Sequence, residues 1–266
     1  MFIYLRTVSV QRFLISTLYL LLLTHAAAVQ ADSTTAESDF DEVGADAYVD
    51  QDKLSTQAFP EPEEFSTWEL MLDRDGVQIY TQPWAGSDFV AFKTVQTVSA
   101  DLKDVLAHFT DVSGFNAWIP NLKSARLIRE FDDSNERSIY LHLGMPWPLY
   151  DRDSVIGQRV GQDEETLVVK IEEWSEARSL PERDGLVRVP TLMAEIFLMP
   201  LRLGQTKIIW QVHNEPGGSI PSFLVNWMVE SIFFESSVST KAIVEDDALQ
   251  PSSQQFAWLK EPISSP

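Results

Sequence analysis

The sequence of 266 residues lacks cysteine and has only four histidines. Without cysteine, the chain can form neither disulfide bonds nor thiolate metal sites, and it has no acceptor for an N-terminal lipoprotein anchor. It also contains no His-x-x-x-His pair, no glycine-rich phosphate loop and no Gly-x-Ser-x-Gly motif. These absences remove the usual sequence signs of zinc enzymes, nucleotide-binding enzymes and serine hydrolases. We therefore expect a protein without catalytic residues, metal or cofactor.

Positively charged residues are scarce as well. The chain has 20 Lys and Arg residues against 40 Asp and Glu residues, which gives a formal net charge of −20 at pH 7. A chain with this negative charge is repelled by the phosphate backbone of a nucleic acid and by an anionic membrane surface. The composition thus excludes nucleic acid as an expected partner.

A long hydrophobic run is also missing, but a short one stands near the N-terminus. Arg6 and Arg12 precede the mostly apolar residues 13–23. Residues with small side chains follow this run and end at Ala31. This order is typical of a secretory signal peptide. The apolar stretch is shorter than the ~20 residues that a membrane-spanning helix needs. The sequence predicts a signal peptide at 1–31, cleaved after Ala31, in preference to an uncleaved anchor, and hence an exported protein that is periplasmic or secreted.

The rest of the chain divides by composition into three parts. Residues 32–65 are acidic and aperiodic, with Lys53 as their single positive residue, so they are expected to form a disordered leader. Residues 66–247 carry the periodic patterns of a folded domain. Residues 248–266 contain three prolines and are expected to form a tail.

Within residues 66–247, strand-like alternation surrounds two helical segments. Strands are expected at 77–82, 89–98, 125–130, 138–144, 153–160, 166–174, 186–199 and 206–213. Helices are expected at about 102–109 and from Pro221 to about Asp246. The short connections between the central strands require an antiparallel meander. The last helix is the one element long enough to cover a face of that sheet, so the fold class is α+β.

Four local motifs add a family likeness. They are Trp68 with Asp73-Arg74-Asp75-Gly76-Val77, then Trp118-Ile119-Pro120, then Met145-Pro146-Trp147-Pro148-Leu149-Tyr150-Asp151-Arg152-Asp153, and finally Glu215-Pro216-Gly217-Gly218-Ser219-Ile220-Pro221. In this order and spacing they resemble the START (StAR-related lipid-transfer) domain family of the helix-grip, Bet v 1-like superfamily. The resemblance implies a curved antiparallel β-sheet wrapped around a long C-terminal α-helix, with an internal cavity for a lipid or sterol.

Large apolar side chains and one ion pair are the expected lining of that cavity, because ligand sites are mostly apolar with few polar groups. Glu195 stands in a run that is apolar on both strand faces, so it needs a partner if it is buried, and Arg159 is the candidate. The candidate ligand-binding residues are Trp118, Met145, Trp147, Arg159, Met193, Glu195, Phe197, Trp210, Trp227 and Met228.

The remaining polar residues are interpreted as structural. Asp151-Arg152-Asp153 is expected to fix the start of a strand through an ion pair or a turn, with contact between Arg152 and a ligand headgroup as the alternative. Strand alternation places His142 and His213 on the polar, outward faces of their strands. His108 falls on the first helix beside Phe109 and has no facing partner nearby in sequence.

The expected function is to hold a lipid, sterol or other apolar small molecule, as a carrier, transfer protein or sensor that touches membranes transiently. Two alternatives stay open. One is an enzyme like the polyketide cyclases and aromatases on the same fold, and the other is a partner-binding subunit with a collapsed cavity. The size of the cavity and the number of polar groups that face it distinguish the three.

Overall fold

The computed structural model describes residues 68–131, 135–202, 204–246, 256 and 258–260. The predicted signal peptide (1–31), the acidic leader (32–65) and most of the C-terminal tail lie outside the described residues. The side chains of Arg202 and Trp227 lie outside them too.

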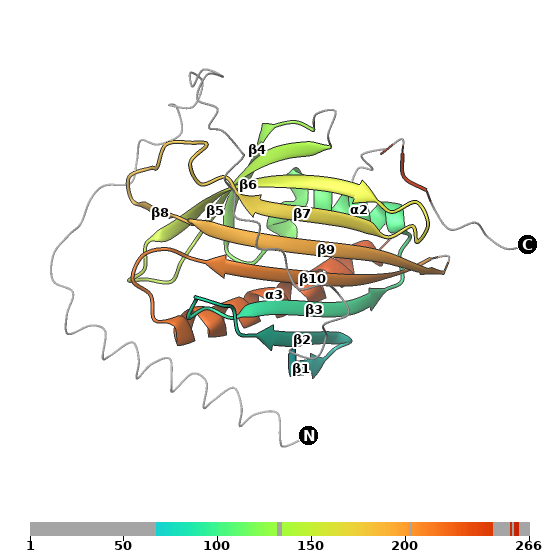
Figure 1. Ribbon diagram of the computed structural model, residues 1–266, viewed down its shortest axis with the longest axis horizontal. Coiled ribbons are helices and arrows are strands. Elements are labelled where there is room, and N and C mark those ends of the chain that lie inside the picture. Colours follow the sequence, from blue (N-terminus) through green and yellow to red (C-terminus); the bar gives the residue numbers. More distant parts are fainter. Residues whose placement is uncertain (1–67, 132–134, 203, 247–255, 257, 261–266) are drawn as a thin grey trace, which may run out of the picture. The chain divides into compact units, whose positions relative to one another are not determined.

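A ten-stranded, largely antiparallel sheet dominates the described part of the chain (Figure 1). The strands follow the order β1-β2-β3-β10-β9-β7-β6-β5-β4, and the short β8 pairs in parallel with β6. Most strands that follow each other in the chain also pair in the sheet. The pairing of β3 with β10 is different, because it brings together strands from the two ends of the domain. The strands are β1 (Glu69–Arg74), β2 (Val77–Gln82), β3 (Ala91–Val98), β4 (Leu122–Arg129), β5 (Glu136–Leu143), β6 (Asp151–Gln162), β7 (Val169–Ser175), β8 (Leu186–Arg188), β9 (Thr191–Arg202) and β10 (Gln205–Glu215).

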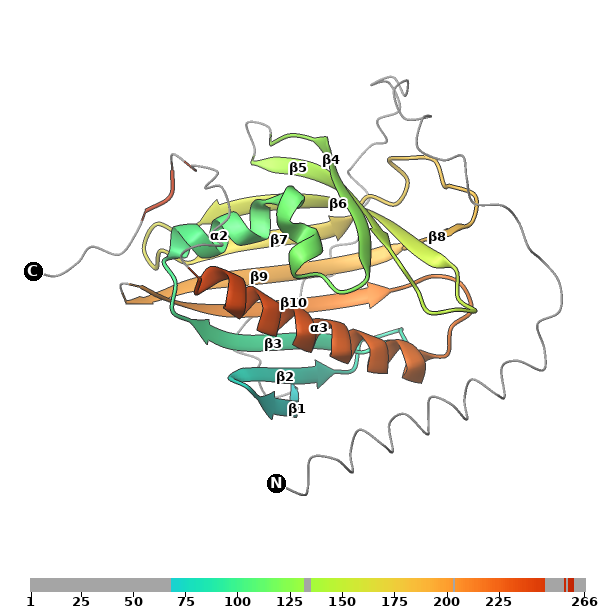
Figure 2. The ribbon, with the colours of Figure 1, turned by 180° about the vertical axis from the view of Figure 1, so that it is seen from behind.

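The helices lie on one face of this sheet (Figure 2). They are α2 (Leu102–Thr110), the 3-10 helix η2 (Val112–Ala117) and α3 (Ser222–Val244). α3 contacts β2 and β3, and α2 contacts α3, β9 and β10. We call the covered side of the sheet the inner face and the opposite side the outer face.

A tight turn at Asp75 and Gly76 joins β1 to β2. Asp75 and Gly76 have φ values of 55° and 78°, the pair of positive angles that a two-residue type I′ hairpin requires. The strand before the turn was not predicted. Its residues are nearly all exposed, so β1 carries no alternation between buried and exposed positions that could reveal it.

The α+β helix-grip architecture predicted from the sequence is confirmed by this curved antiparallel sheet and its long C-terminal helix. One predicted strand, 186–199, is divided into β8 and β9. The division falls at Val189 and Pro190, because proline has no backbone N–H to donate to a neighbouring strand.

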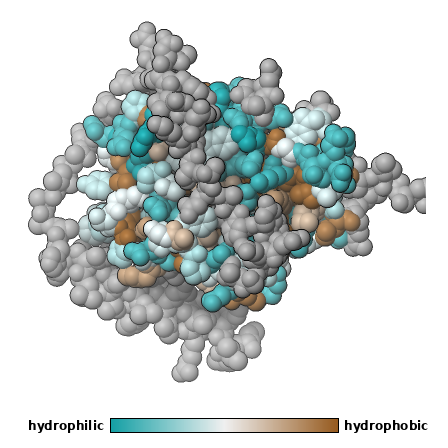
Figure 3. All heavy atoms as spheres, viewed as in Figure 1, coloured by the Kyte–Doolittle hydropathy of each residue, from teal (hydrophilic) through white to brown (hydrophobic). Residues whose placement is uncertain are grey.

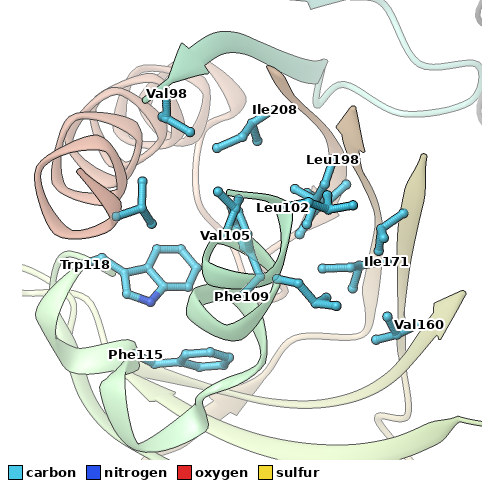
Figure 4. Close-up of a cluster of buried hydrophobic side chains, with 14 of the residues drawn as sticks. Val98, Leu102, Val105, Phe109, Phe115, Trp118, Val160, Ile171, Leu198 and Ile208 are labelled. Carbon is cyan, nitrogen blue, oxygen red and sulfur yellow. The ribbon is translucent and has the colours of Figure 1, made fainter. Parts of the chain in front are cut away.

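Buried apolar residues form two clusters. The larger lies between α2, η2 and the sheet and includes Phe109, Phe115 and Trp118 (Figure 4). The smaller lies beneath α3 and includes Phe92 and Phe233, whose rings stack with centroids 6.2 Å apart. Fully burying a side chain of this size contributes roughly 1.5–3 kcal/mol. The larger cluster therefore holds α2 and, through Val244, the C-terminal end of α3 against the sheet, and the smaller cluster holds α3 through Phe233.

Candidate functional site

Trp210 marks the middle of the inner face. On β10 it pairs with Thr94 of β3 and Ile196 of β9. The centroid of its ring lies 4.4 Å from that of Phe233 in α3 and 6.1 Å from that of Phe109 in α2. The side chains directly opposite Trp210 on the neighbouring strands, and those two residues before or after them, also face the helices.

The two apolar clusters meet at residues that are only partly buried. Leu192 and Trp210 pack against both clusters, and both keep accessible surface. Glu173 and Ser175 of β7 also belong to the inner face and keep accessible surface. These four partly accessible residues lie where the two clusters meet, and we call this boundary the break in the packing.

A row of polar side chains crosses the inner face beside this break. Arg137 Nε of β5 donates to Gln158 Oε1 of β6 at 2.9 Å, and Gln158 Nε2 donates to Glu173 Oε1 of β7 at 2.7 Å. Arg137 and Gln158 are fully buried. Burial lowers the pKa of Arg137 to about 10, so the guanidinium group stays charged at neutral pH. Burial also raises the pKa of Glu173, and the hydrogen bond from Gln158 and the charge of Arg137 oppose that shift.

Two of the predicted lining residues lie on the inner side of the fold. The rings of Trp118 and Trp210 come within 6.0 Å of each other between α2, η2 and β10. Met228 lies on α3 and is partly buried. Trp227 belongs to the same helix, but its side chain is outside the described residues.

Four predicted lining residues lie instead on the outer face, so this part of the prediction is wrong. Arg159, Met193, Glu195 and Phe197 alternate with residues that belong to the buried clusters, and their side chains point away from α3. The proposed pair between Arg159 and Glu195 is wrong too. Arg159 is half exposed and pairs with Glu136.

The reason for the error is that both faces of β9 carry apolar residues. The inner face of β9 is formed by Leu192, Ala194, Ile196 and Leu198. On the outer face, Lys170 Nζ bonds to Glu195 Oε1 at 2.8 Å and lies 5.7 Å from the centroid of the Phe197 ring. Polar and apolar residues therefore do not alternate along β9, and the sequence does not indicate which of its faces is the inner one. Figure 3 shows this outer side of the molecule, where hydrophilic residues surround smaller hydrophobic patches.

Met145 and Trp147 lie in the loop between β5 and β6. Trp147 is 53% exposed, and Met145 is partly buried with its backbone N–H donating to Asp151 Oδ1 at 3.0 Å. Neither residue belongs to the two buried clusters, so the loop does not bring them to the break in the packing.

Asp151-Arg152-Asp153 forms the structural attachment that the sequence favoured. Asp151 accepts from Lys123 Nζ at 2.7 Å, and Asp153 makes a buried ion pair with Arg188 at 2.8 Å. Arg152 is buried and donates to the carbonyl oxygens of Pro216 at 3.4 Å and Gly217 at 3.3 Å, just before α3. All three side chains thus bind protein groups.

The histidines are more buried than the sequence indicated. His213 does lie on the outer face, but the loop after β2 covers it and the Trp84 ring stacks on it with centroids 4.3 Å apart. The outward face predicted for His213 is therefore right, but the side chain is buried there. His142 is partly exposed and bonds to Asp151 at 2.8 Å. His108 lies buried between α2 and α3.

The polar row of Arg137, Gln158 and Glu173 was missed from the sequence. A signal was present, because each residue shares its strand phase with buried apolar residues such as Ile139, Val160 and Ile171. In a chain with so many charged residues, a few charged or polar side chains in this phase do not stand out. Their pairing across three strands becomes visible only with the register of the sheet.

The described residues contain no cluster of His, Asp or Glu that could hold a metal ion. Over the same part of the chain, no helix is long and apolar enough to cross a membrane.

Comparisons with known proteins agree with this architecture. The solved structure of a STAR-related lipid transfer protein fragment from Xanthomonas axonopodis superposes with a TM-score of 0.62 and 26% identity, over 68% of this chain and 99% of that one. Human StAR-related lipid transfer protein 5 gives a TM-score of 0.62 at 17% identity, over 68% and 88% of the two chains, and so supports the fold.

Sequence relatives extend the agreement. An uncharacterized protein of Pseudomonas aeruginosa is 34% identical over 162 residues, which cover 61% of this chain and 79% of that protein. The phosphatidylcholine transfer protein of Bos taurus is 25% identical over 171 residues, which cover 62% and 78% of the two chains. The START domain profile matches residues 61–248. This chain belongs to the START domain family.

Proposed function

We propose that this protein is an exported lipid-binding protein that holds one apolar ligand between the inner face of the sheet and α3. The observation that carries the proposal is the break between the two buried clusters, where Leu192, Trp210, Glu173 and Ser175 keep accessible surface although they face the helices. Relatives named as phosphatidylcholine transfer proteins support a lipid or sterol as the ligand class. The role is that of a carrier, a transfer protein or a sensor.

The chemistry around the break suits binding better than catalysis. Leu192 and Trp210 supply apolar surface, and Glu173 and Ser175 supply a small polar area. Arg137 lies behind Gln158 and has almost no accessible surface, so it is not presented to a substrate. A mostly apolar site with few polar groups is typical of a ligand pocket.

Export rests on the N-terminal signal at residues 1–31. N-terminal sequencing of the protein purified from its own host should begin at Asp32. Recovery from membranes of a chain that keeps the residues before Asp32 would support an uncleaved anchor instead.

Native mass spectrometry of the purified protein, followed by lipid extraction, tests the binding function. We expect a one-to-one complex with an apolar molecule. Replacing Leu192 by Trp should fill the interior and abolish the complex without unfolding the protein. Met193→Trp is the matched control, because this neighbour points to the outer face, and it should bind as the wild type does.

A wild-type protein that carries no lipid and takes up none from vesicles would overturn the proposal. That result would favour the partner-binding subunit with a filled interior. Loss of binding in both variants, with unchanged melting temperatures, would place the ligand elsewhere on the molecule.

A further inference from the structure

We propose that the C-terminal residues Phe256, Trp258, Leu259 and Lys260 form a strap that closes the interior beside the turn between β6 and β7, and that this strap detaches when an apolar ligand passes at this end. We call these four residues the C-terminal strap. This inference rests on the proposed lipid-binding function and adds a control on it, because the docked strap slows the exchange of the ligand.

The C-terminal strap lies at the end of β6 (Figure 1). Gln162, the last residue of β6, bonds to Lys260, whereas Arg152, at the beginning of the same strand, bonds to Gly217 just before α3. A strand rises about 3.3 Å per residue, so these two contacts are roughly 30 Å apart along β6. The strap therefore closes the interior at the end opposite to the start of α3.

The apolar side chains of the C-terminal strap cover the larger buried cluster. Phe256, Trp258 and Leu259 pack against this cluster and are partly buried. The centroid of the Phe256 ring lies 5.8 Å from that of Phe131, just after β4, and Arg137 Cζ lies 4.6 Å from the centroid of the same Phe131 ring. Arg137 is the member of the polar row farthest from the break in the packing. The strap thus covers the side of the interior at which the polar row ends.

The polar contacts that attach the C-terminal strap lie at the exposed surface. Gln162 Nε2 donates to the Lys260 carbonyl oxygen at 2.9 Å, and the Lys260 N–H donates to Gln162 Oε1 at 2.8 Å. Lys260 Nζ lies 3.3 Å from Glu164 Oε1, and these two side chains are 55% and 83% exposed, so the ion pair contributes little. A short segment held in this way can open locally while the sheet stays folded.

Detachment of the C-terminal strap does not require a movement of α3. The helix has its own contacts with the sheet, through Phe233 in the smaller cluster and Val244 in the larger one. The Ser99 N–H also donates to Glu245 Oε1, just after the helix, at 2.8 Å. These contacts involve no residue of the strap, so the strap can leave while α3 stays in place. Its aromatic rings lose their apolar contacts when it leaves, which makes the docked position the favoured one.

A reversible disulfide bond tests whether the strap must detach. The chain has no cysteine, so the double variant Gln162→Cys with Lys260→Cys contains a single pair of thiols. The probe is a fluorescent phosphatidylcholine or a fluorescent sterol, whichever the protein takes up. The reduced variant is loaded with the probe, half of it is oxidised, and release of the probe to neutral phosphatidylcholine vesicles is followed. The oxidised form, with its strap locked to β6, should release the probe at least about tenfold more slowly than the reduced form.

Removal of the strap should have the opposite effect. An element that is open for a tenth to a third of the time limits exchange to that fraction, so a chain that ends at Gln255 should exchange the probe roughly 3- to 10-fold faster than the wild type. The matched control is a chain that ends at Lys260. It keeps the strap and should exchange as the wild type does.

Thermal melting shows whether each variant is folded. Gly157→Ala shows the effect of lower stability alone, because its added methyl group meets Trp174 on the outer face, away from the strap, and it should leave the exchange rate unchanged. Equal release from the oxidised and reduced forms, or wild-type exchange in the folded chain that ends at Gln255, would overturn this inference and leave the proposed function intact. Uptake of neither probe by the wild type would overturn the proposed function, and this inference with it.

Discussion

His108 of α2 and Thr240 of α3 are joined by a hydrogen bond of 3.0 Å between Nε2 and Oγ1. Both side chains are buried, and the His108 ring also packs 4.9 Å from the ring of Trp118. Burial lowers the pKa of His108 to about 4, because a charged imidazole loses its hydration there. The contact between the two helices therefore depends on a neutral histidine.

The first prediction is that this histidine makes stability fall in acid. Between its ordinary pKa of 6.5 and about 4, the unfolded chain binds a proton at His108 that the folded chain does not. The free energy of unfolding therefore decreases as the pH is lowered through that window, by at most about 3 kcal/mol. Urea unfolding from about pH 7 to about pH 5 should show a weaker pH dependence in His108→Gln than in the wild type.

Thr240→Val is the control for that experiment. It removes the hydrogen bond and leaves the buried imidazole in place, so it should lower stability by about 1 kcal/mol at every pH and keep the wild-type slope. An unchanged slope in His108→Gln would show that other groups cause the acid sensitivity.

The second prediction concerns the buried ion pair of Asp153 and Arg188. Arg188 donates to both carboxylate oxygens of Asp153, at 2.8 and 2.9 Å, and the two side chains are 1% and 4% exposed. Asp153→Ala leaves a buried guanidinium without its counter-ion and should cost roughly 3–5 kcal/mol of unfolding free energy. Lys123→Ala breaks an exposed pair with Asp151 and should cost about 1 kcal/mol or less. Chemical denaturation of both variants measures the difference, and equal losses would contradict it.

The third prediction compares two glycines of β6. A Cβ atom at Gly157 would lie 2.3 Å from the Trp174 ring, whereas one at Gly161 would meet nothing within 4 Å. Gly157→Ala must displace the indole ring and should destabilise the protein by about 1–3 kcal/mol. Gly161→Ala should change stability by about 0.5 kcal/mol or less. Thermal melts of the two variants give the comparison, and similar melting temperatures would show that Trp174 moves aside freely.

The architecture could be predicted because its pattern is local. Turn residues separate the strands, and apolar spacing identifies α2 and α3 before any contact is known. The face of each inner strand could also be assigned where alternation is clean, as it is for Trp210 between Ile208 and Val212. The family likeness then supplied the arrangement of helix and sheet.

The site could not be predicted to the same depth, for two physical reasons. On β9 both phases carry apolar residues, because Met193 and Phe197 stand on the outer face opposite Trp174 and Lys170 of β7, so the inward side was ambiguous. On β5, β6 and β7 the missed residues are polar, and an inward-facing Glu173 is understandable only once Gln158 is known to lie opposite it. Cross-strand partners are a property of register, which composition and periodicity do not reveal.

The first residues of β6 each attach a segment that is far away along the chain. Asp151 holds Lys123, 28 residues away, Arg152 holds the carbonyl of Gly217, 65 residues away, and Asp153 holds Arg188, 35 residues away. Long loops must close before any of these contacts can form, which costs conformational entropy early in folding. The start of β6 is therefore expected to order after the transition state for folding. Substitutions at these three residues should accelerate unfolding and leave the folding rate nearly unchanged.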